Sequence, residues 1–195
     1  EPIESLEDYK GMKIRFAGLG GKVLERLGAS VTMMPGGELF QALEKGTIDA
    51  TEFSMPVIDQ ILGFNKVVNY NLFPGWHQPF TAQYMLINGD EWEAATESQK
   101  ALIETTCTAA TTMGLAEGEY KNGSILQEFQ KKGVQTQQIP MDVLRELKDV
   151  TDEVLAEEAE NDEDFARVLK SQRAFQKDYA VWGKRAYLPA ELTEE

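Results

Sequence analysis

Met12-Lys-Ile-Arg-Phe-Ala-Gly-Leu-Gly-Gly21 is the stretch that decides the fold. Polar and apolar residues alternate over 12–16, which predicts a short strand, and the glycines that follow at once predict a tight loop. The loop leads into a helix over about 21–27, and Gly28 ends this helix. The sequence therefore opens with a predicted strand and helix.

The same order of elements is repeated as far as residue 53. A second strand is predicted at 31–34, the helix that follows a Pro-Gly-Gly turn ends at Gly46, and a third strand covers 48–53. Two strand-and-helix units followed by a strand predict a parallel α/β sheet with right-handed connections.

The middle of the chain is β-rich and then becomes helical. Residues 67–73 and 80–88 are predicted strands on either side of the turn Pro74-Gly-Trp-His-Gln-Pro79. Thr96-Glu-Ser-Gln99 has the pattern of a capping box, so a helix is predicted to begin there and to run as far as Lys132. Glycines inside this helix weaken it and favour a kink.

Two further helices are predicted in the last third of the chain. A strand near 134–139 is followed by a helix that Pro140 opens, and Asp162 starts the last helix. This last helix has a seam of near-heptad spacing, which suits packing against a neighbouring domain or subunit. The seam consists of Phe165, Val168, Leu169, Gln172, Phe175, Tyr179 and Trp182.

Charge and composition exclude several classes of partner. The 195 residues include 19 Lys and Arg against 33 Asp and Glu, a formal net charge of −14. Nucleic acids and anionic membranes both require a basic face, so this charge argues against them. No apolar run approaches the roughly 18 residues of a membrane span. The lone Cys107 excludes an internal disulfide and a multi-cysteine metal site, and it is interpreted as a small buried apolar side chain.

Arg15 is the first candidate binding residue. It lies near the C-terminal end of the first predicted strand, and ligands of open parallel sheets bind beyond the carboxyl ends of the strands. Its planar guanidinium can pair with both oxygens of a carboxylate. The alternative is a structural ion pair with one of the many acids.

Four further residues are expected at the same edge of the sheet: Glu52, and Trp76, His77 and Gln78 on one turn. Glu52 lies in the third predicted strand, so its carboxylate is either a partner of Arg15 or a ligand for a hard cation such as Ca²⁺ or Na⁺. Trp76 is either a core side chain or the wall of a pocket. His77 is interpreted as a polar loop residue, because a zinc site would need further His or Cys ligands.

No catalytic set is evident in the sequence. Ser54 and Ser98 lack a plausible His and Asp pairing. The run Gly18-Leu-Gly-Gly21 lacks the third Gly or Ala of a dinucleotide-binding fingerprint, because Val23 stands in its place. These absences favour a binding protein over an enzyme.

Three motifs together resemble the substrate-binding proteins of TRAP transporters, which are tripartite ATP-independent periplasmic uptake systems. The motifs are Lys10-Gly-Met-Lys-Ile-Arg15, Gly36-Gly-Glu-Leu-Phe-Gln-Ala-Leu-Glu-Lys-Gly-Thr-Ile-Asp-Ala-Thr-Glu52 and Phe73-Pro-Gly-Trp76. The middle motif is the most specific. Residues 175–182 also match, so the resemblance covers essentially the whole chain.

The resemblance implies an α/β clamshell of the periplasmic binding protein type II kind, with this chain as its C-terminal part and with long helices on the back and at the C-terminus. Four parts are implied: an α/β lobe with ligand-facing strand ends at 1–66, crossing strands and a hinge at 67–95, a long helix, strand and helix that complete the lobe at 96–160, and a C-terminal helix at 161–195. A signal peptide and an N-terminal lobe are expected to precede Glu1, and the protein is expected in the periplasm.

In this family the arginine of Lys-x-Arg binds the substrate carboxylate, and Arg15 occupies its position. The branch that binds 2-oxo and 2-hydroxy monocarboxylates reads Thr-Glu-Trp where this chain reads Thr51-Glu-Phe53. In that branch the Glu side chain and the next backbone carbonyl hold a cation that bridges to the substrate. The implied substrate-binding residues are Arg15, Glu52, Phe53 and Trp76.

The same branch reads Pro-Gly-Trp-Trp-Glu, with the last Glu as a further cation ligand, where this chain reads Pro74-Gly-Trp-His-Gln78. An amide oxygen also coordinates hard cations, although one negative charge is lost. The implied cation is Ca²⁺ or Na⁺, and its ligands are Glu52, the Phe53 carbonyl and Gln78.

The leading hypothesis is a receptor, not an enzyme, that captures a small organic acid and delivers it to the permease subunits of a TRAP transporter. One alternative is an α/β enzyme that uses Arg15 and Glu52 for chemistry on a carboxylic acid. The other is a module in which the helix over 165–182 mediates homodimerisation. Dimerisation is compatible with the receptor hypothesis, because some family members dimerise through a terminal helix.

Overall fold

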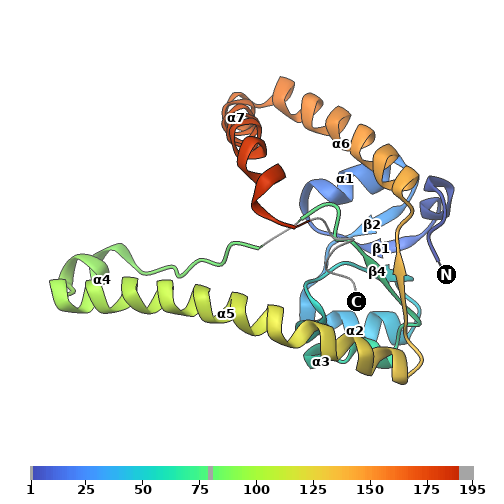
Figure 1. Cartoon of the computed structure of the whole chain (residues 1–195), viewed down its shortest axis with the longest axis horizontal. Helices are drawn as coiled ribbons and strands as arrows, with labels where there is room; N and C mark the ends of the chain where they lie inside the picture. The colour runs from blue at the N-terminus through green and yellow to red at the C-terminus, as the bar shows by residue number, and fades with distance from the viewer. Residues whose placement is uncertain (1, 79–80, 189–195) are drawn as a thin grey trace. The chain divides into compact units, whose positions relative to one another are not determined.

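The structure is a computed structural model that describes residues 2–78 and 81–188. Its elements fall into two compact units, Glu1–Leu144 and Arg145–Glu195. The first unit opens with the 3₁₀-helix η1 (Leu6–Tyr9) and contains strands β1 to β5 (Figure 1). The four-part division expected from the sequence stays a prediction.

The first sheet is parallel, as predicted. Its strand order is β2-β1-β3, with β1 (Lys13–Arg15) between β2 (Ser30–Thr32) and β3 (Ala50–Thr51). Helix α1 (Gly18–Arg26) connects β1 to β2, and α2 (Gly36–Glu44) connects β2 to β3. The strands are shorter than predicted, and α1 begins directly at the glycines because Gly18 takes a φ of 63° there.

Helix α2 supplies one side of a core cluster of the first unit. This cluster also receives Phe64 from η2 (Phe64–Lys66), and half-buried apolar residues from the neighbouring segments pack around it. Its buried members are Leu39, Ala42, Leu43, Ile48 and Phe64. The cluster fixes the end of α2 against the segment that leads into β3.

Helix α3 (Pro56–Leu62) has no counterpart among the predicted elements. Pro56 occupies one of its first positions, where a missing N–H costs nothing, and Gly63 ends it with a left-handed φ of 78°. These start and stop signals are in the sequence, but the run between them is too short to display helical periodicity.

The second sheet pairs β4 (Tyr70–Phe73) with β5 (Gln135–Gln138) in parallel, at the places predicted from the sequence. The predicted strand at 80–88 is wrong for residues 81–88, which have no regular secondary structure, and Phe80 lies outside the described residues. A strand needs a neighbour for its backbone hydrogen bonds, and no described strand pairs with 81–88.

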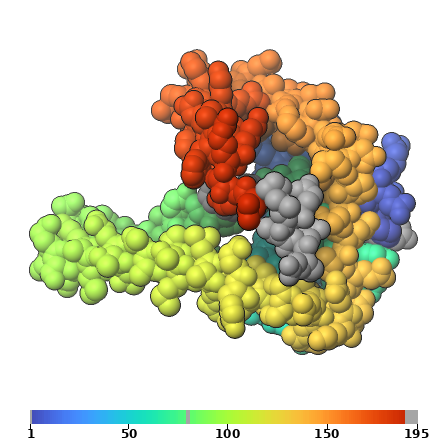
Figure 2. Space-filling view, in the orientation of Figure 1, coloured from blue at the N-terminus to red at the C-terminus, as the bar shows by residue number. Residues whose placement is uncertain are grey.

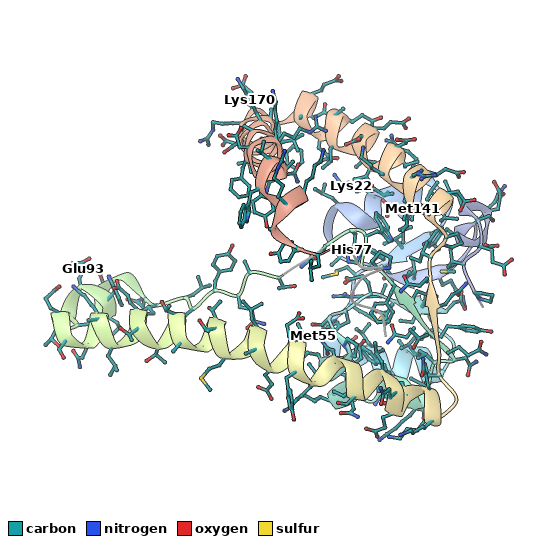
Figure 3. All side chains as sticks on the ribbon, in the orientation of Figure 1. Lys22, Met55, His77, Glu93, Met141 and Lys170 are labelled. Atoms are coloured by element: carbon teal, nitrogen blue, oxygen red, sulfur yellow. The ribbon has the colours of Figure 1, made fainter. Side chains whose placement is uncertain are left out.

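A short helix, α4 (Gly89–Ala94), precedes the long α5 (Glu97–Lys131). The predicted capping box of α5 is confirmed, because the Thr96 hydroxyl accepts from the Gln99 backbone while the Gln99 side chain accepts from the Thr96 backbone. The helix continues through its glycines. Figure 3 shows Met55 beside α5. A Cβ at Gly118 would collide with the Met55 sulfur.

The first half of α5 is exposed, while its second half packs against α3. Val57 N donates to Asn122 Oδ1 at 3.1 Å, and Gln60 donates to Glu128 at 2.9 Å. The expected burial of Cys107 is wrong, because this residue is exposed. Figure 2 shows the first half of α5 uncovered on the face that is in view. No described segment buries that part of the helix, so a small apolar side chain there has no core to join.

The second unit is helical. Helix α6 (Met141–Asn161) starts directly after Pro140, and α7 (Glu163–Ala186) starts after Asp162, whose carboxylate accepts from Phe165 N at 2.9 Å. Both starts agree with the sequence. Arg173 of α7 lies 3.4 Å from the Asp152 carboxylate of α6. None of the helices in the described ranges combines the length and the apolarity that a membrane crossing requires.

Candidate functional site

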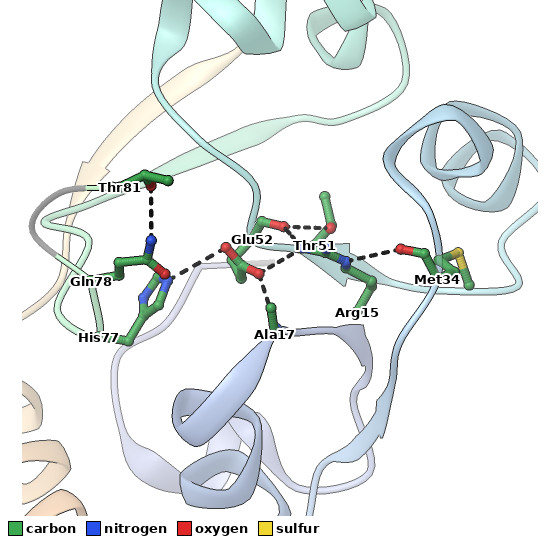
Figure 4. Close-up of polar contacts among 8 residues, drawn as sticks. All are labelled: Arg15, Ala17, Met34, Thr51, Glu52, His77, Gln78 and Thr81. Atoms are coloured by element: carbon green, nitrogen blue, oxygen red, sulfur yellow. Dashed lines mark hydrogen bonds and ion pairs between the residues drawn. The ribbon is translucent and has the colours of Figure 1, made fainter. Parts of the chain in front are cut away.

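Arg15 is the last residue of the central strand β1, and its side chain is 8% exposed. Its Nη1 donates to the Glu52 backbone carbonyl at 2.9 Å and to Glu52 Oε1 at 2.6 Å, and its Nε lies 3.4 Å from the Met34 carbonyl (Figure 4). Nη2 donates no hydrogen bond to any residue in the described part of the chain. Within residues 2–78 and 81–188, Arg15 therefore keeps one donor group without a hydrogen-bond partner.

Glu52 follows β3 and is held at both carboxylate oxygens. Oε1 accepts from Ala17 N at 3.0 Å in addition to Arg15, and Oε2 lies 3.5 Å from His77 Nε2 (Figure 4). Burial raises the pKa of Glu52, but the hydrogen bonds from His77 and Ala17 and the charge of Arg15 outweigh it and hold that pKa below its usual value. Glu52 is therefore an anion at neutral pH.

Aromatic rings surround this ion pair. The Phe16 ring stacks on Trp76 at 5.9 Å between centroids and meets the edge of His77 at 4.5 Å. The Phe53 ring lies 5.6 Å from the Arg15 guanidinium carbon, which is within the range of a cation–π contact. Gly20 permits this packing, because a Cβ there would collide with Phe16.

The structure brings four of the five candidate residues together. Arg15, Glu52, Phe53 and Trp76 lie at one edge of the first sheet with their neighbours. The fifth, Gln78, is exposed, and its amide nitrogen donates to Thr81 Oγ1 at 2.8 Å (Figure 4). That contact leaves the Gln78 amide oxygen free of hydrogen bonds to the described residues.

His77 is more integrated than a polar loop residue. Its side chain is 15% exposed, it lies between Glu52 and Phe16, and its Nδ1 is buried with no partner among the described residues. Its position at this edge was expected from the turn at 74–79, but its burial between Glu52 and Phe16 was not, because the sequence analysis interpreted it as a polar loop residue.

Two functional neighbours were missed by sequence reasoning. Phe16 was assigned only to a strand, and Asp59 lies on the unpredicted helix α3. Burial first, and the negative charge of Glu52 second, raise the pKa of Asp59 to about 7. The sequence signal that could have indicated Asp59 is the presence of an acidic residue inside the apolar run that follows Pro56.

Oxygen atoms of the kind that hard cations bind lie at this edge, on Glu52 and Phe53, and on the exposed Gln78 of the neighbouring turn. No three His, Cys, Asp or Glu side chains gather anywhere in the described ranges, so a cation here would depend on main-chain and amide oxygens besides Glu52. Glu52 Oε2, the Phe53 carbonyl and the Gln78 amide oxygen are all oxygen donors of the kind that Ca²⁺ accepts.

Comparison with known protein families identifies the family of this chain. The family described as "Bacterial extracellular solute-binding protein, family 7" (DctP) matches residues 1–162. The chain belongs to this family. DctP proteins are solute-binding proteins, not enzymes. The predicted resemblance to TRAP substrate-binding proteins is therefore confirmed, and the enzyme alternative is not supported.

A relative of this DctP chain found by sequence is also a solute-binding protein. A monocarboxylate 2-oxoacid-binding periplasmic protein of Nostoc sp. is 31% identical over 182 residues, which are 93% of this chain and 50% of the relative. The chain thus spans about half the length of this curated relative.

Two solved TRAP solute-binding proteins share the fold. One, from Pseudoalteromonas atlantica with bound sodium and pyruvate, has a TM-score of 0.86 and 33% identity, over 94% of this chain and 56% of that chain. The other, from Bordetella bronchiseptica, is a mixed-occupancy dimer with calcium and picolinate in its active site; its TM-score is 0.85 and its identity 31%, over 94% of this chain and 55% of that chain. The predicted α/β periplasmic-binding-protein fold class is confirmed.

Proposed function

We propose that this DctP chain binds a small 2-oxo or 2-hydroxy carboxylic acid outside the cytoplasm, through a carboxylate that pairs with Arg15. The observation that carries the proposal is the buried guanidinium at the carboxyl end of the central strand, with Nη2 free of described partners. A charge-assisted pair in such a poorly solvated position is stronger than one in water. Trp76, Phe16 and Phe53 supply the apolar surroundings.

A Ca²⁺ or Na⁺ ion bound by Glu52, the Phe53 carbonyl and the Gln78 amide oxygen is part of this proposal. Support comes from the oxygen-only donor set and from the calcium and sodium in the two solved relatives. The cation would supply positive charge between Glu52 and the acid. Arg15 and the aromatic rings would orient the acid and exclude water.

The last part of the proposal is that the protein delivers the bound acid from the periplasm to the membrane permease subunits of a TRAP transporter. The support is membership of a family of bacterial extracellular solute-binding proteins and similarity to TRAP receptors. A net charge of −14 does not oppose anion capture, because exposed acids beyond about 10 Å are screened while Arg15 is buried.

Calorimetric titration tests the proposed function. Pyruvate, lactate and picolinate are titrated into the chain with Ca²⁺ and, separately, with EDTA, and a neutral amide of similar size serves as the control ligand. We expect saturable binding of at least one acid and none of the amide. Absence of binding by all three acids in both buffers would refute the proposed function.

We also propose that α7 mediates homodimerisation. Its exposed apolar side chains favour this second role: Val168, Phe175, Tyr179, Val181 and Trp182 are between 45% and 68% exposed. The Bordetella relative is described as a dimer. Exposed apolar stripes of this kind mark interaction surfaces.

Sedimentation tests the second role. The chain is expected to sediment as a dimer, whereas a chain that ends at Asn161 is expected to sediment as a monomer with the helical content of its remaining elements. An unchanged oligomeric state after removal of α7 would rule out this helix as the interface.

A further inference from the structure

Arg15 already has a carboxylate partner within its own chain. Its Nη1 contacts both the backbone carbonyl and the side-chain Oε1 of Glu52, at 2.9 and 2.6 Å. The two side chains are 8% and 14% exposed, so water screens them weakly. A carboxylate ligand would therefore meet a guanidinium whose single positive charge is shared with Glu52.

The Glu52 side chain is also held in place beside Arg15 by other contacts. Ala17 N holds Oε1 at 3.0 Å, and His77 Nε2 lies 3.5 Å from Oε2, so both oxygens have contacts on the protein side. The charge of Glu52 also reaches Asp59 on α3, where burial and this charge together raise the Asp59 pKa to about 7. An acid at the free Nη2 of Arg15 would stand next to a fixed anion, and like charges at such short range repel.

We propose that Glu52 is an internal competitor for Arg15, and that the charge of Glu52 is itself the cause of any cation requirement. This inference rests on the proposed function. Glu52 keeps its position while a cation neutralises its charge, and Arg15 then accepts the carboxylate of the acid. Cation and acid consequently bind with positive coupling, and the coupling passes through Glu52.

The competitor role makes an unusual prediction for Glu52→Gln, which keeps the side-chain shape and an oxygen acceptor but loses the charge. If Glu52 were only a cation ligand, its replacement would weaken acid binding in Ca²⁺ and leave acid binding unchanged in EDTA. A competitor would instead improve acid binding in the absence of a cation. Acid binding in EDTA therefore separates the two roles.

Pyruvate is titrated into the parent chain, Glu52→Gln and Glu44→Gln, each with Ca²⁺ and with EDTA. Glu44 is exposed at the end of α2, so its replacement controls for the loss of one negative charge. In the parent and in Glu44→Gln we expect Ca²⁺ to raise pyruvate affinity at least about tenfold, which is a usual size for coupled sites. In EDTA, Glu52→Gln should bind pyruvate at least about tenfold more tightly than the parent, and Ca²⁺ should change its affinity less than about twofold.

Two outcomes overturn the inference while the proposed function stands. In the first, Glu52→Gln binds pyruvate no more tightly than the parent in EDTA. In the second, the parent has the same pyruvate affinity in both buffers. If the parent binds no acid at all, the proposed function fails and the inference fails with it.

A measurement on the parent alone keeps the test independent of how Glu52→Gln folds. Coupling between two ligands is reciprocal, so saturating pyruvate must raise Ca²⁺ affinity by the same factor by which Ca²⁺ raises pyruvate affinity. Ca²⁺ affinity that is unchanged by pyruvate would overturn the inference.

Discussion

Arg15→Ala is expected to weaken pyruvate binding on the order of 100-fold in Ca²⁺ buffer, because truncating one partner of a buried hydrogen-bonded charge pair costs about 2–5 kcal/mol. The acid loses its guanidinium partner at Nη2, and the buried Glu52 loses the hydrogen-bonded arginine that holds it in place. Isothermal titration of the parent and the variant measures the change.

Two variants make this result specific. Arg15→Lys keeps the charge but loses the planar fork, so we expect a loss of about tenfold with a better-preserved fold. Lys13→Ala removes a positive charge from the exposed start of the same strand, where it pairs with Asp49 at 3.4 Å, and should change affinity less than about twofold. If a folded Arg15→Ala variant bound pyruvate as tightly as the parent, Arg15 would not be a binding residue.

Asp59→Asn is expected to stabilise the chain at pH 7.5 by about 2–4 kcal/mol and to remove most of the pH dependence of stability between pH 4 and 7. The pKa of Asp59 is about 7 when folded, against an ordinary value of 3.8. The folded state therefore binds more protons than the unfolded state in this window, so the parent loses stability as the pH rises through it. Below pH 4 the two proteins should be equally stable.

Urea denaturation in EDTA at several pH values measures this effect. Asp149→Asn, on the exposed side of α6, is the matched control and should follow the parent. A parent whose unfolding free energy rises between pH 4 and 7 in the same way as that of Asp59→Asn would show that Asp59 is ionised without penalty.

The meeting of Arg15 and Glu52 was predictable because it depends on topology. Both residues lie at the carboxyl ends of predicted parallel strands, and adjacent parallel strands bring such ends to one edge. The register places Arg15 opposite Thr51, so Glu52 follows directly beside it. Local signals were equally reliable at the capping box of Thr96 and at Asp162.

Features that depend on distant segments were not predictable. The turn at 74–79 was expected to face the edge with Arg15, but the direct contact of His77 with Glu52 depends on how that turn returns to the first sheet, and no local pattern encodes it. Residues 81–88 have strand-like composition, but strand formation needs a partner strand that the described chain does not place there. Burial of Cys107 likewise required a covering segment.

The central claim is that the ligand is recognised through its carboxylate. Its most direct test is a comparison of pyruvate with methyl pyruvate, the neutral ester of nearly the same shape, by calorimetric titration into the parent chain in Ca²⁺ buffer. We predict that pyruvate binds and that the ester binds on the order of 100-fold more weakly, because it offers Arg15 no charge. Equal affinities for the acid and its ester would contradict this account.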